Sequence, residues 1–276
     1  RTGAVDVYWM RPARGARLWL AGLRGRYPAG AALPDPDLHI GAGHATHLSL
    51  LLARRARGGR CVVLMKPSLP RGWFDLCVVP EHDRVTPASN VRITRGALTA
   101  VTPGSGGDPA AGLLLIGGPS RHHAWSDRAL AAQVAAIVQR EAAIHWTLTT
   151  SRRTPAPTLA LLRAIQASNL VIVPYADTDR DWLPAQLARA AAVWVSEDSV
   201  SMVYEALTAG AATGLLAVPR RRASRIGRAM DNLVRDKLVL DFSAWQAGAS
   251  LARPVTTFNE AARVAAWIRT TWLHAR

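Results

Sequence analysis

The stretch WVSEDSVSMVYEALTAG, residues 194–210, begins as an apolar strand and ends as a helix. Five polar side chains crowd the junction between the two: Ser196, Glu197, Asp198, Ser199 and Ser201. A helix that starts at Ser199 or Ser201 leaves backbone N–H groups free at the positive end of its dipole, and such ends bind anions. The segment therefore predicts a diphosphate site, with Glu205 one turn further on to accept hydrogen bonds from a ribose diol.

A capping arrangement is the simpler alternative for this segment. A serine would cap the helix, and Glu197 and Asp198 would be favourable charges in its first turn. Capping accounts for part of the polar cluster, but it does not explain why all five residues gather there.

Apolar runs and helical patterns alternate along the second half of the chain. Strands are expected at 113–118, 144–150, 170–174, 192–196, 213–219 and 238–242. Helices are expected at 127–141, 155–167, 183–191 and 224–236, besides the one ending at Gly210, and a last amphipathic helix at 259–275. Strands that are apolar throughout, each followed by a helix, indicate a parallel sheet covered on both faces.

The first half shows the same alternation. Strands are expected at 5–10, 38–40, 61–65 and 75–79, with a helix at 47–57. The Gly- and Pro-rich stretch 102–112 is typical of a linker. We therefore predict an α/β protein with two doubly wound Rossmann-like domains, whose ligands bind at the carboxyl ends of the strands, in an interdomain cleft. The expected domains are 1–104 and 105–256, with 257–276 as a C-terminal helix packing back on the first domain.

The loop GGPSRHH, residues 117–123, follows the first strand of the second series. Gly117 and Gly118 leave open space beside the backbone, and Ser120 can form hydrogen bonds. Arg121 supplies a guanidinium fork that matches a phosphate group. These residues are candidates for binding a nucleotide-diphosphate donor.

The loop SRRTP, residues 151–155, follows the next strand. Ser151 can cap the following helix. Arg152 and Arg153 stand side by side at the carboxyl end of the strand, where two cations contribute little to stability. We expect this pair to bind an anion.

The loop GAGHATH, residues 41–47, starts like a dinucleotide-binding fingerprint. Gly41 and Gly43 would let the backbone turn tightly and approach a ligand, although a simple tight turn is also consistent with them. Thr46 takes the place of the third glycine, and Lys66 rather than an acid ends the next strand. NAD is therefore not expected.

Several titratable residues of the first half are candidates for a general base. His44 and His47 either face the cleft or are structural. The segment PEHD, residues 80–83, adds three more groups at a strand end: Glu81, His82 and Asp83. One of them could take a proton from a reacting hydroxyl, and a solvated turn is the alternative.

The chain carries a formal charge of +15, from 34 basic and 19 acidic residues. Lys66 and Lys237 are the only lysines, so the excess comes from arginine. Compositional bias explains this excess as well as a polyanionic partner does: a nucleic acid, a phosphorylated glycolipid or an anionic membrane face. No nucleic-acid motif is present. The segment PRRRASRIGR, residues 219–228, is expected to be an exposed basic loop and helix start at a lipid surface, and phosphate binding is the alternative.

Other features bear on compartment and cofactors. No apolar run is long enough to span a bilayer, and no signal peptide is evident. Cys61 and Cys77 lie in apolar strand-like runs, which predicts buried reduced thiols and a cytoplasmic protein. No metal-binding spacing occurs, and DTD at 177–179 is better explained as a turn.

Five motifs, in order, resemble the bacterial relatives of the plant elongated-mitochondria fission protein: PDLHIGAGHATH, PSLPRGWFDLCVVPEHD, IGGPSRHHAW, TTSRRTP and SEDSVSMVYEALTAG. The resemblance covers about residues 35–235. Bacterial members are described as glycosyltransferases of the GT-B superfamily, and some are linked to the outer core of lipooligosaccharide. The resemblance thus implies the GT-B fold.

The segment 197–210 is also similar to the donor loop of the peptidoglycan lipid-intermediate N-acetylglucosaminyltransferase. This similarity implies that Glu205 binds the donor ribose. It places four residues near the diphosphate: Ser199, Val200, Ser201 and Met202. The loop from Gly117 to Ser120 would line the same donor site, and the loop of Gly41, Gly43 and His47 would lie on the acceptor side.

One feature departs from the family pattern. Such proteins usually begin with a strand and another glycine-rich loop, whereas this chain opens with RTGAVDVYWM. Two explanations stay open: the sequence starts after that loop, or this member has lost it. Catalytic competence depends on which explanation holds.

We therefore expect a metal-independent glycosyltransferase without a cofactor, which moves a sugar from a nucleotide-diphosphate sugar to a hydroxyl of a glycolipid or lipopolysaccharide-core acceptor. His44, Glu81 and Asp83 are the candidate catalytic bases. The protein would be cytoplasmic and peripheral on the inner face of an anionic membrane, with no nucleic-acid partner. Two rivals stay open: a nucleotide-sugar epimerase or hydrolase of the same fold, and a non-catalytic membrane-associated interaction protein.

Overall fold

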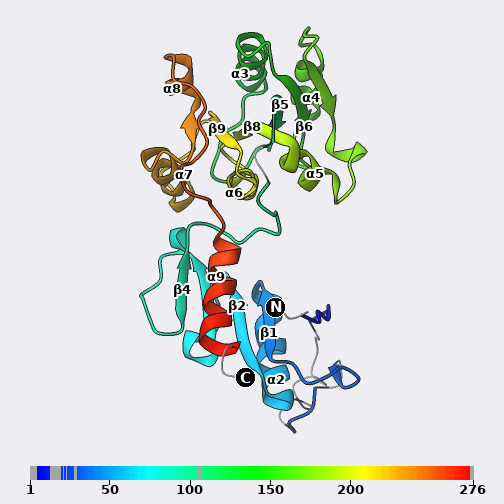
Figure 1. Cartoon of the computed structure of the whole chain (residues 1–276), viewed down its shortest axis with the longest axis vertical. Helices are drawn as coiled ribbons and strands as arrows, with labels where there is room; N and C mark the ends of the chain where they lie inside the picture. The colour runs from blue at the N-terminus through cyan, green and yellow to red at the C-terminus, as the bar shows by residue number, and fades with distance from the viewer. Residues whose placement is uncertain are drawn as a thin grey trace. The chain divides into compact units, whose positions relative to one another are not determined.

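The computed structural model describes residues 5–12, 20, 22, 24–27, 30–104 and 107–273. The chain divides into two compact units, Arg1–Ala97 and Leu98–Arg276 (Figure 1). This division precedes the boundary expected at residue 104, because the segment before it already packs on the second unit. Val101 lies against that unit's core, and the Gly104 N–H donates to the Ala209 carbonyl at 3.0 Å. The C-terminal segment is also grouped with this unit, and Phe258 is part of its core.

The first unit contains a four-stranded parallel sheet in the order β1-β2-β3-β4. Its strands are β1 (Leu38–Ala42), β2 (Arg60–Leu64), β3 (Leu76–Pro80) and β4 (Val91–Thr94). Helix α2 (His47–Arg57) follows β1, whereas short 3-10 turns, Arg71–Trp73 and Glu81–Asp83, precede and follow β3. The sequence predicted the first three strands and the helix but not β4.

The two cysteines lie in the core of this unit. Cys61 and Cys77 are fully buried and free, as predicted. Burial raises the pKa of the Cys61 thiol to about 12 and that of Cys77 to about 11. Both thiols are therefore protonated at neutral pH.

The strand expected at 5–10 is wrong. Residues 5–10 form no strand, and Val5 and Trp9 are 81% and 94% exposed. Their β-branched and aromatic composition suits a pleated surface, but a strand forms only when a neighbouring strand satisfies its backbone.

The second unit contains a six-stranded parallel sheet in the order β10-β9-β8-β5-β6-β7. Its strands are β5 (Asp108–Leu115), β6 (His145–Thr149), β7 (Leu170–Val173), β8 (Ala190–Ser196), β9 (Ala212–Leu216) and β10 (Leu240–Asp241). The chain starts in the middle with β5, builds outward to β7, returns to pair β8 with β5, and builds outward on the other side. This is the doubly wound order, in which ligands bind outside the carboxyl ends of the two central strands.

Helices cover both faces of this sheet (Figure 1). On one face lie α3 (Asp127–Arg140), α4 (Ala156–Arg163) and α8 (Phe242–Gln246). On the other lie α5 (Trp182–Arg189), α6 (Val200–Ala209) and α7 (Arg225–Arg235). Alternate residues of β5 and β8 point to opposite faces, and each face is apolar, as expected of a covered parallel sheet.

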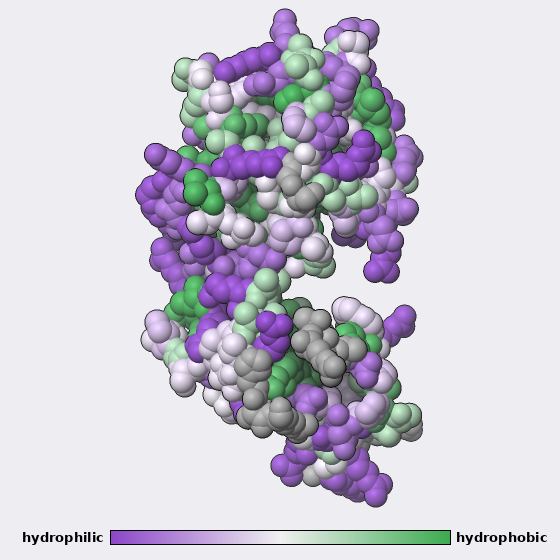
Figure 2. Space-filling model, in the orientation of Figure 1, coloured by the Kyte–Doolittle hydropathy of each residue, from purple (hydrophilic) through white to green (hydrophobic). Residues whose placement is uncertain are grey.

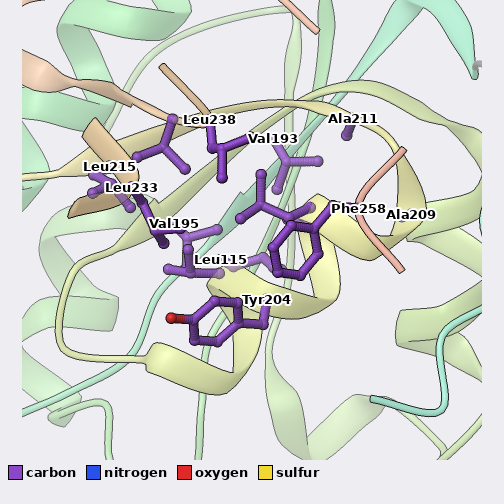
Figure 3. Packing of buried hydrophobic residues seen from close by; sticks show 14 of the residues in the cluster. Leu115, Val193, Val195, Tyr204, Ala209, Ala211, Leu215, Leu233, Leu238 and Phe258 are labelled. Carbon is purple, nitrogen blue, oxygen red and sulfur yellow. The ribbon is translucent and has the colours of Figure 1, made fainter. Parts of the chain in front are cut away.

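The core beneath α6 shows how this helix is held (Figure 3). Tyr204 on α6 is fully buried and stacks on Phe258, with ring centroids 5.8 Å apart and an interplanar angle of 20°. Val193 and Val195 of β8 and Leu115 of β5 complete the contact. This packing fixes the start of α6 relative to the ends of β5 and β8.

The remaining elements differ from the expectations in detail. Strand β5 begins at Asp108, inside the predicted linker, and α8 was not predicted. The last helix is α9 (Glu260–Ile268), continued by a π-helical turn, Arg269–Leu273. The end of the range expected for it lies outside the described residues.

Candidate functional site

The carboxyl ends of β5 and β8 meet at the start of α6. Ser199 occupies the N-cap position, but its side chain forms no cap hydrogen bond. The first turn of a helix has no intrahelical partners for its N–H groups. Among the described residues, the N–H groups of Val200, Ser201 and Met202 have no hydrogen-bond acceptor. The N-terminal start of α6 therefore has free N–H groups that can bind an anion.

The loop after β5 is fastened to the loop after β8. The Gly117 N–H donates to Ser196 Oγ at 2.7 Å, and the Gly118 N–H donates to Asp198 Oδ2 at 3.0 Å. A Cβ atom at Gly117 would lie 2.3 Å from the Asp198 carboxylate. Glycine is thus required there for the close approach of the two loops, rather than for space beside a ligand alone.

Arg153, in the loop after β6, joins the same arrangement. Its guanidinium donates to the Gly118 carbonyl at 2.8 Å, to the Pro119 carbonyl at 3.2 Å and to Asp198 Oδ2 at 2.8 Å. The Asp198 side chain is 0% exposed, and that of Arg153 is 43% exposed. Arg153 therefore neutralises a buried carboxylate and ties three strand-end loops together.

Ser151 and Thr154 organise the β6 loop from within. The Ser151 N–H donates to Thr154 Oγ1 at 2.8 Å, and the Arg153 N–H donates to Ser151 Oγ at 3.2 Å. Thr154 Oγ1 donates to the Ile116 carbonyl at 3.1 Å, at the end of β5. Ser151 thus holds the loop in shape, whereas helix α4 begins after Pro155 without a side-chain cap.

Ser120 and Arg121 shape the far part of the β5 loop. Ser120 Oγ accepts the N–H groups of His122 and His123, at 3.2 and 3.1 Å. Arg121 Nε donates to His122 Nε2 at 2.9 Å, and the Arg121 side chain is exposed. His123 is buried, and burial lowers its pKa. Their predicted contacts with a donor stay predictions.

Arg152 lies in the loop after β6, and Glu205 lies in the second turn of α6. Arg152 is exposed and lies over the ring of Tyr175, 5.9 Å from its centroid. The Tyr175 N–H donates to Thr150 Oγ1 at 3.0 Å, which joins the ends of β6 and β7. Glu205 is partly buried on α6, and burial raises its pKa. Of the other α6 candidates, Ser201 is exposed, whereas Met202 packs against the core.

The loop after β9 closes the arrangement. The Ala124 N–H donates to the Pro219 carbonyl at 2.7 Å, and the Arg221 N–H donates to the His122 carbonyl at 2.9 Å. Arg220 forms ion pairs with Glu197 and Asp231. Four neighbouring strands, β6, β5, β8 and β9, thus end in loops that are bonded to one another.

Sequence reasoning missed what the two acids of the junction do. Asp198 and Glu197 are not first-turn charges, because each pairs with an arginine of another loop. Ser196 accepts the Gly117 N–H from a distant strand. The sequence does contain a signal for these ion pairs, because arginines follow other strands of the same sheet and can pair with the two acids.

The candidate residues of the first unit lie at the carboxyl edge of its own sheet. Gly43 has a φ of 85°, which favours glycine, and a Cβ at Gly41 would meet the Thr46 side chain at 2.8 Å. His47 is buried, with Nδ1 3.1 Å from Ser68 Oγ. Burial, followed by the nearby His44, lowers the pKa of His47. His44 itself is exposed.

Glu81 and Asp83 lie in the turn after β3. Both are partly buried, and Lys66 Nζ donates to the Asp83 carbonyl at 3.3 Å. Because β1 and β3 are parallel, these residues share a sheet edge with His44.

The described residues contain neither a metal-holding cluster nor a membrane-spanning helix. Within these ranges, no group of three His, Cys, Asp or Glu side chains is placed to hold a metal ion. No helix in the same ranges has the length and apolar character needed to cross a bilayer.

Two solved structures with the same fold are described as UDP-N-acetylglucosamine 2-epimerases. A Listeria monocytogenes protein assigned as a UDP-N-acetylglucosamine 2-epimerase aligns with a TM-score of 0.56 and 13% identity, over 97% of this chain and 83% of that one. The UDP-GlcNAc 2-epimerase of Methanocaldococcus jannaschii aligns with a TM-score of 0.53 and 10% identity, over 85% and 77%. At these identities the likeness shows the fold, which is the GT-B type predicted.

Sequence comparison defines the relationship further. No curated protein matches the chain significantly. The family described as mitochondrial fission ELM1 matches residues 4–272. This range contains all five motifs on which the resemblance was based. Since the match spans almost the whole sequence, the chain belongs to the mitochondrial fission ELM1 family.

Proposed function

We propose that the protein is a glycosyltransferase that uses a nucleotide-diphosphate sugar. The observation that carries this proposal is the uncapped start of α6 between the ends of β5 and β8. Ligands of doubly wound sheets bind at this position, and a helix start with free N–H groups favours a diphosphate. The fold is that of proteins described as acting on UDP-N-acetylglucosamine.

Each donor-side residue has a role in this proposal. The N–H groups of Val200, Ser201 and Met202 bind the diphosphate, and Glu205 accepts hydrogen bonds from the ribose hydroxyls. Arg153 neutralises the Asp198 carboxylate, so that this negative charge does not repel the phosphates. Groups that are already oriented toward the leaving diphosphate stabilise its developing charge without reorganising.

The acceptor side rests on the first unit. The acceptor hydroxyl loses its proton to one of His44, Glu81 and Asp83, and its oxygen forms a bond to the anomeric carbon while the bond to the diphosphate breaks. The nucleoside diphosphate leaves with the electron pair of that bond. We assign a glycolipid or lipopolysaccharide-core acceptor from the resemblance of the five motifs. Action at the inner face of an anionic membrane, without a metal or cofactor, belongs to the same assignment.

Epimerisation is the second candidate, because two structures that share the fold are described as UDP-N-acetylglucosamine 2-epimerases. An epimerase interconverts a nucleotide sugar with no acceptor present. Incubating the protein with a panel of nucleotide sugars, with and without a lipid extract, separates the two reactions by their products.

Donor binding is tested at the first residue of α6. Val200→Pro removes one N–H group at a helix position that accepts proline, so the helix is kept. Val200→Ala also removes the branched valine side chain but keeps the N–H group, and it is the matched control. A hydrogen bond to a charged group is worth about 1.5–3 kcal/mol, so Val200→Pro should weaken binding of UDP roughly tenfold to a hundredfold.

Calorimetric titration with UDP provides the measurement. Equal affinities for the two variants would contradict a diphosphate at this helix start. No binding of any nucleoside diphosphate by the unmodified protein would remove the proposal altogether and leave the non-catalytic interaction protein as the better description.

A further inference from the structure

His123 is a buried titratable group, at the carboxyl edge of the second unit's sheet, to which the proposed mechanism gives no role. Hydrophilic residues cover much of the surface shown in Figure 2, whereas His123 is 1% exposed. Its backbone pairs with Arg220 of the β9 loop in an antiparallel bridge. Because β8 lies between β5 and β9, the β5 loop must cross the carboxyl end of β8 to reach this bridge. His123 therefore fixes the far side of the loop that carries the donor-binding candidates Gly117, Gly118 and Ser120.

The hydroxyl group of Ser120 links this loop to the His123 ring. Ser120 Oγ accepts the backbone N–H groups of His122 and His123, at 3.2 and 3.1 Å, and lies 3.3 Å from His123 Nδ1. A hydroxyl group can accept two hydrogen bonds and donate one. Since the two N–H groups use both acceptor positions, the hydroxyl proton is left to point at Nδ1. His123 Nδ1 therefore acts as the acceptor and carries no proton.

The environment of the ring agrees with this hydrogen-bond direction. Burial is the main cause that lowers the pKa of His123; the Asp198 carboxylate raises this pKa, and the charges of Arg220, His122 and Arg153 lower it. The net direction is downward, so His123 is neutral at neutral pH. A neutral imidazole that accepts at Nδ1 carries its single proton on Nε2. Within the part of the chain that the structure describes, Nε2 is buried and has no hydrogen-bond partner.

The groups around His123 oppose a second proton on its ring. The neighbouring loops supply three arginines and one carboxylate: Arg153 after β6, Asp198 after β8, and Arg220 and Arg221 after β9. Asp198 is already paired with Arg153, and Arg220 is paired with Glu197 and Asp231. A second proton would also turn Nδ1 into a donor, for which Ser120 Oγ has no acceptor position left. Protonation would therefore break the contact that holds Ser120.

We propose that neutral His123 is a positioning residue for the nucleotide-diphosphate donor: it holds Ser120 and, through Ser120, keeps the loop 117–120 in the shape that binds the donor. This role rests on the proposed function, since it assumes that the loop binds a nucleoside diphosphate. If the donor binds only when His123 is neutral, the apparent dissociation constant rises about tenfold for each pH unit below the pKa of His123. This pKa lies below the ordinary value of 6.5, so affinity for the donor should fall in the acidic range and not near neutral pH.

The experiment titrates UDP calorimetrically, from about pH 5 to about pH 8, into the unmodified protein, His123→Asn and His145→Asn. In His123→Asn the amide oxygen replaces Nδ1 as the acceptor for Ser120, but it binds no proton in this range. His145→Asn is the matched control, because His145 is exposed and begins β6, at the opposite edge of the same sheet. The terminal phosphate of UDP also titrates, at about pH 6, but equally for all three proteins. A difference between the proteins therefore reports on His123.

The unmodified protein and His145→Asn should show the same dependence of UDP affinity on pH. His123→Asn should bind UDP nearly as well as they do at the alkaline end, and at the acidic end it should lose about tenfold less affinity than they lose. Parallel pH profiles of the unmodified protein and His123→Asn would overturn the positioning role alone. No binding of UDP by any of the three proteins at the alkaline end would instead remove the proposed function, and the role of His123 with it.

Two further measurements do not depend on whether His123→Asn folds. His123→Gln places its amide near the Nε2 position and leaves Ser120 without its acceptor, so it should bind UDP roughly tenfold more weakly than the unmodified protein at the alkaline end. Equal affinity of these two proteins would contradict a role through Ser120. The ¹⁵N chemical shifts of the His123 ring, measured on the unmodified protein at neutral pH, distinguish the two tautomers. A proton on Nδ1 instead of Nε2 would overturn the proposal.

Discussion

The ion pair between Arg153 and Asp198 predicts an asymmetric response to mutation. Asp198 has a fully buried side chain, whereas Arg153 is 43% exposed. Arg153→Gln leaves a buried carboxylate without its cation. Asp198→Asn leaves an arginine that water can solvate, and the amide oxygen still accepts the Gly118 N–H. The amide nitrogen takes the place of Oδ1, which has no hydrogen-bond partner among the described residues.

The magnitudes follow from this difference. Removing one member of a buried pair costs about 3–5 kcal/mol, and the partial exposure of Arg153 favours the lower end. Arg153→Gln should therefore lower the free energy of unfolding by about 3 kcal/mol. Asp198→Asn replaces charge-assisted bonds by neutral ones and should cost about 1 kcal/mol. The double variant should be more stable than Arg153→Gln alone, since it contains no unpaired buried charge.

Urea unfolding of the two single variants, the double variant and the unmodified protein tests the prediction. The double-mutant cycle gives the coupling free energy directly. The reasoning is refuted if Asp198→Asn costs as much as Arg153→Gln, or if the effects of the two substitutions add. Either result would mean that Asp198 is solvated or held by another group.

Three further outcomes are expected. A Cβ at Gly118 would lie 2.2 Å from a backbone carbonyl oxygen of the β6 loop, so Gly118→Ala should lower the free energy of unfolding by about 2 kcal/mol in a urea titration. Gly72→Ala is the control and should change this free energy little, because nothing lies within 4 Å of a Cβ at Gly72. Burial raises the pKa of Glu205 above 4.5, so the free energy of unfolding should fall as pH rises from 4.5 through the raised pKa; Glu205→Gln should flatten this part of the pH profile. Cys61 and Cys77 should react with a thiol reagent only after unfolding, which a colorimetric assay with and without urea would measure, and rapid reaction of the folded protein would contradict their burial.

Much of the fold of the second unit was predictable, because its strands are apolar on both faces. Runs such as 192–196 and 213–219 have no other stable place than a covered parallel sheet. The short edge strand β4 was not predictable in this way, since Arg92 is partly exposed, Ile93 is exposed, and its apolar run is brief. The prediction for segment 5–10 was wrong in the opposite way, because a strand was predicted where none forms. Its composition suits a strand, but no described strand pairs with it.

The candidate site was predictable as a set of loops but not as a set of bonds. The sequence indicated that the loops after β5, β6 and β8 carry polar residues. Which residue bonds to which depends on the order of the strands, because the partners are far apart in the chain. Arg153 and Asp198 are 45 residues apart, and Gly117 and Ser196 are 79 apart. Only the placement of β5 between β6 and β8 brings these residues together.

The residues at the helix starts of the second unit indicate which helix start binds a ligand. Ser126, Asp241 and Asn259 cap α3, α8 and α9 by accepting an N–H group, as stable helices require. Helix α6 differs from these three, because the serine at its N-cap, Ser199, forms no cap hydrogen bond. Helices α4 and α5 also begin without a side-chain cap, so what distinguishes α6 is its start beside the ends of the two central strands, the place where ligands of doubly wound sheets bind. The proposed nucleoside diphosphate would supply the hydrogen-bond acceptor that the start of α6 lacks.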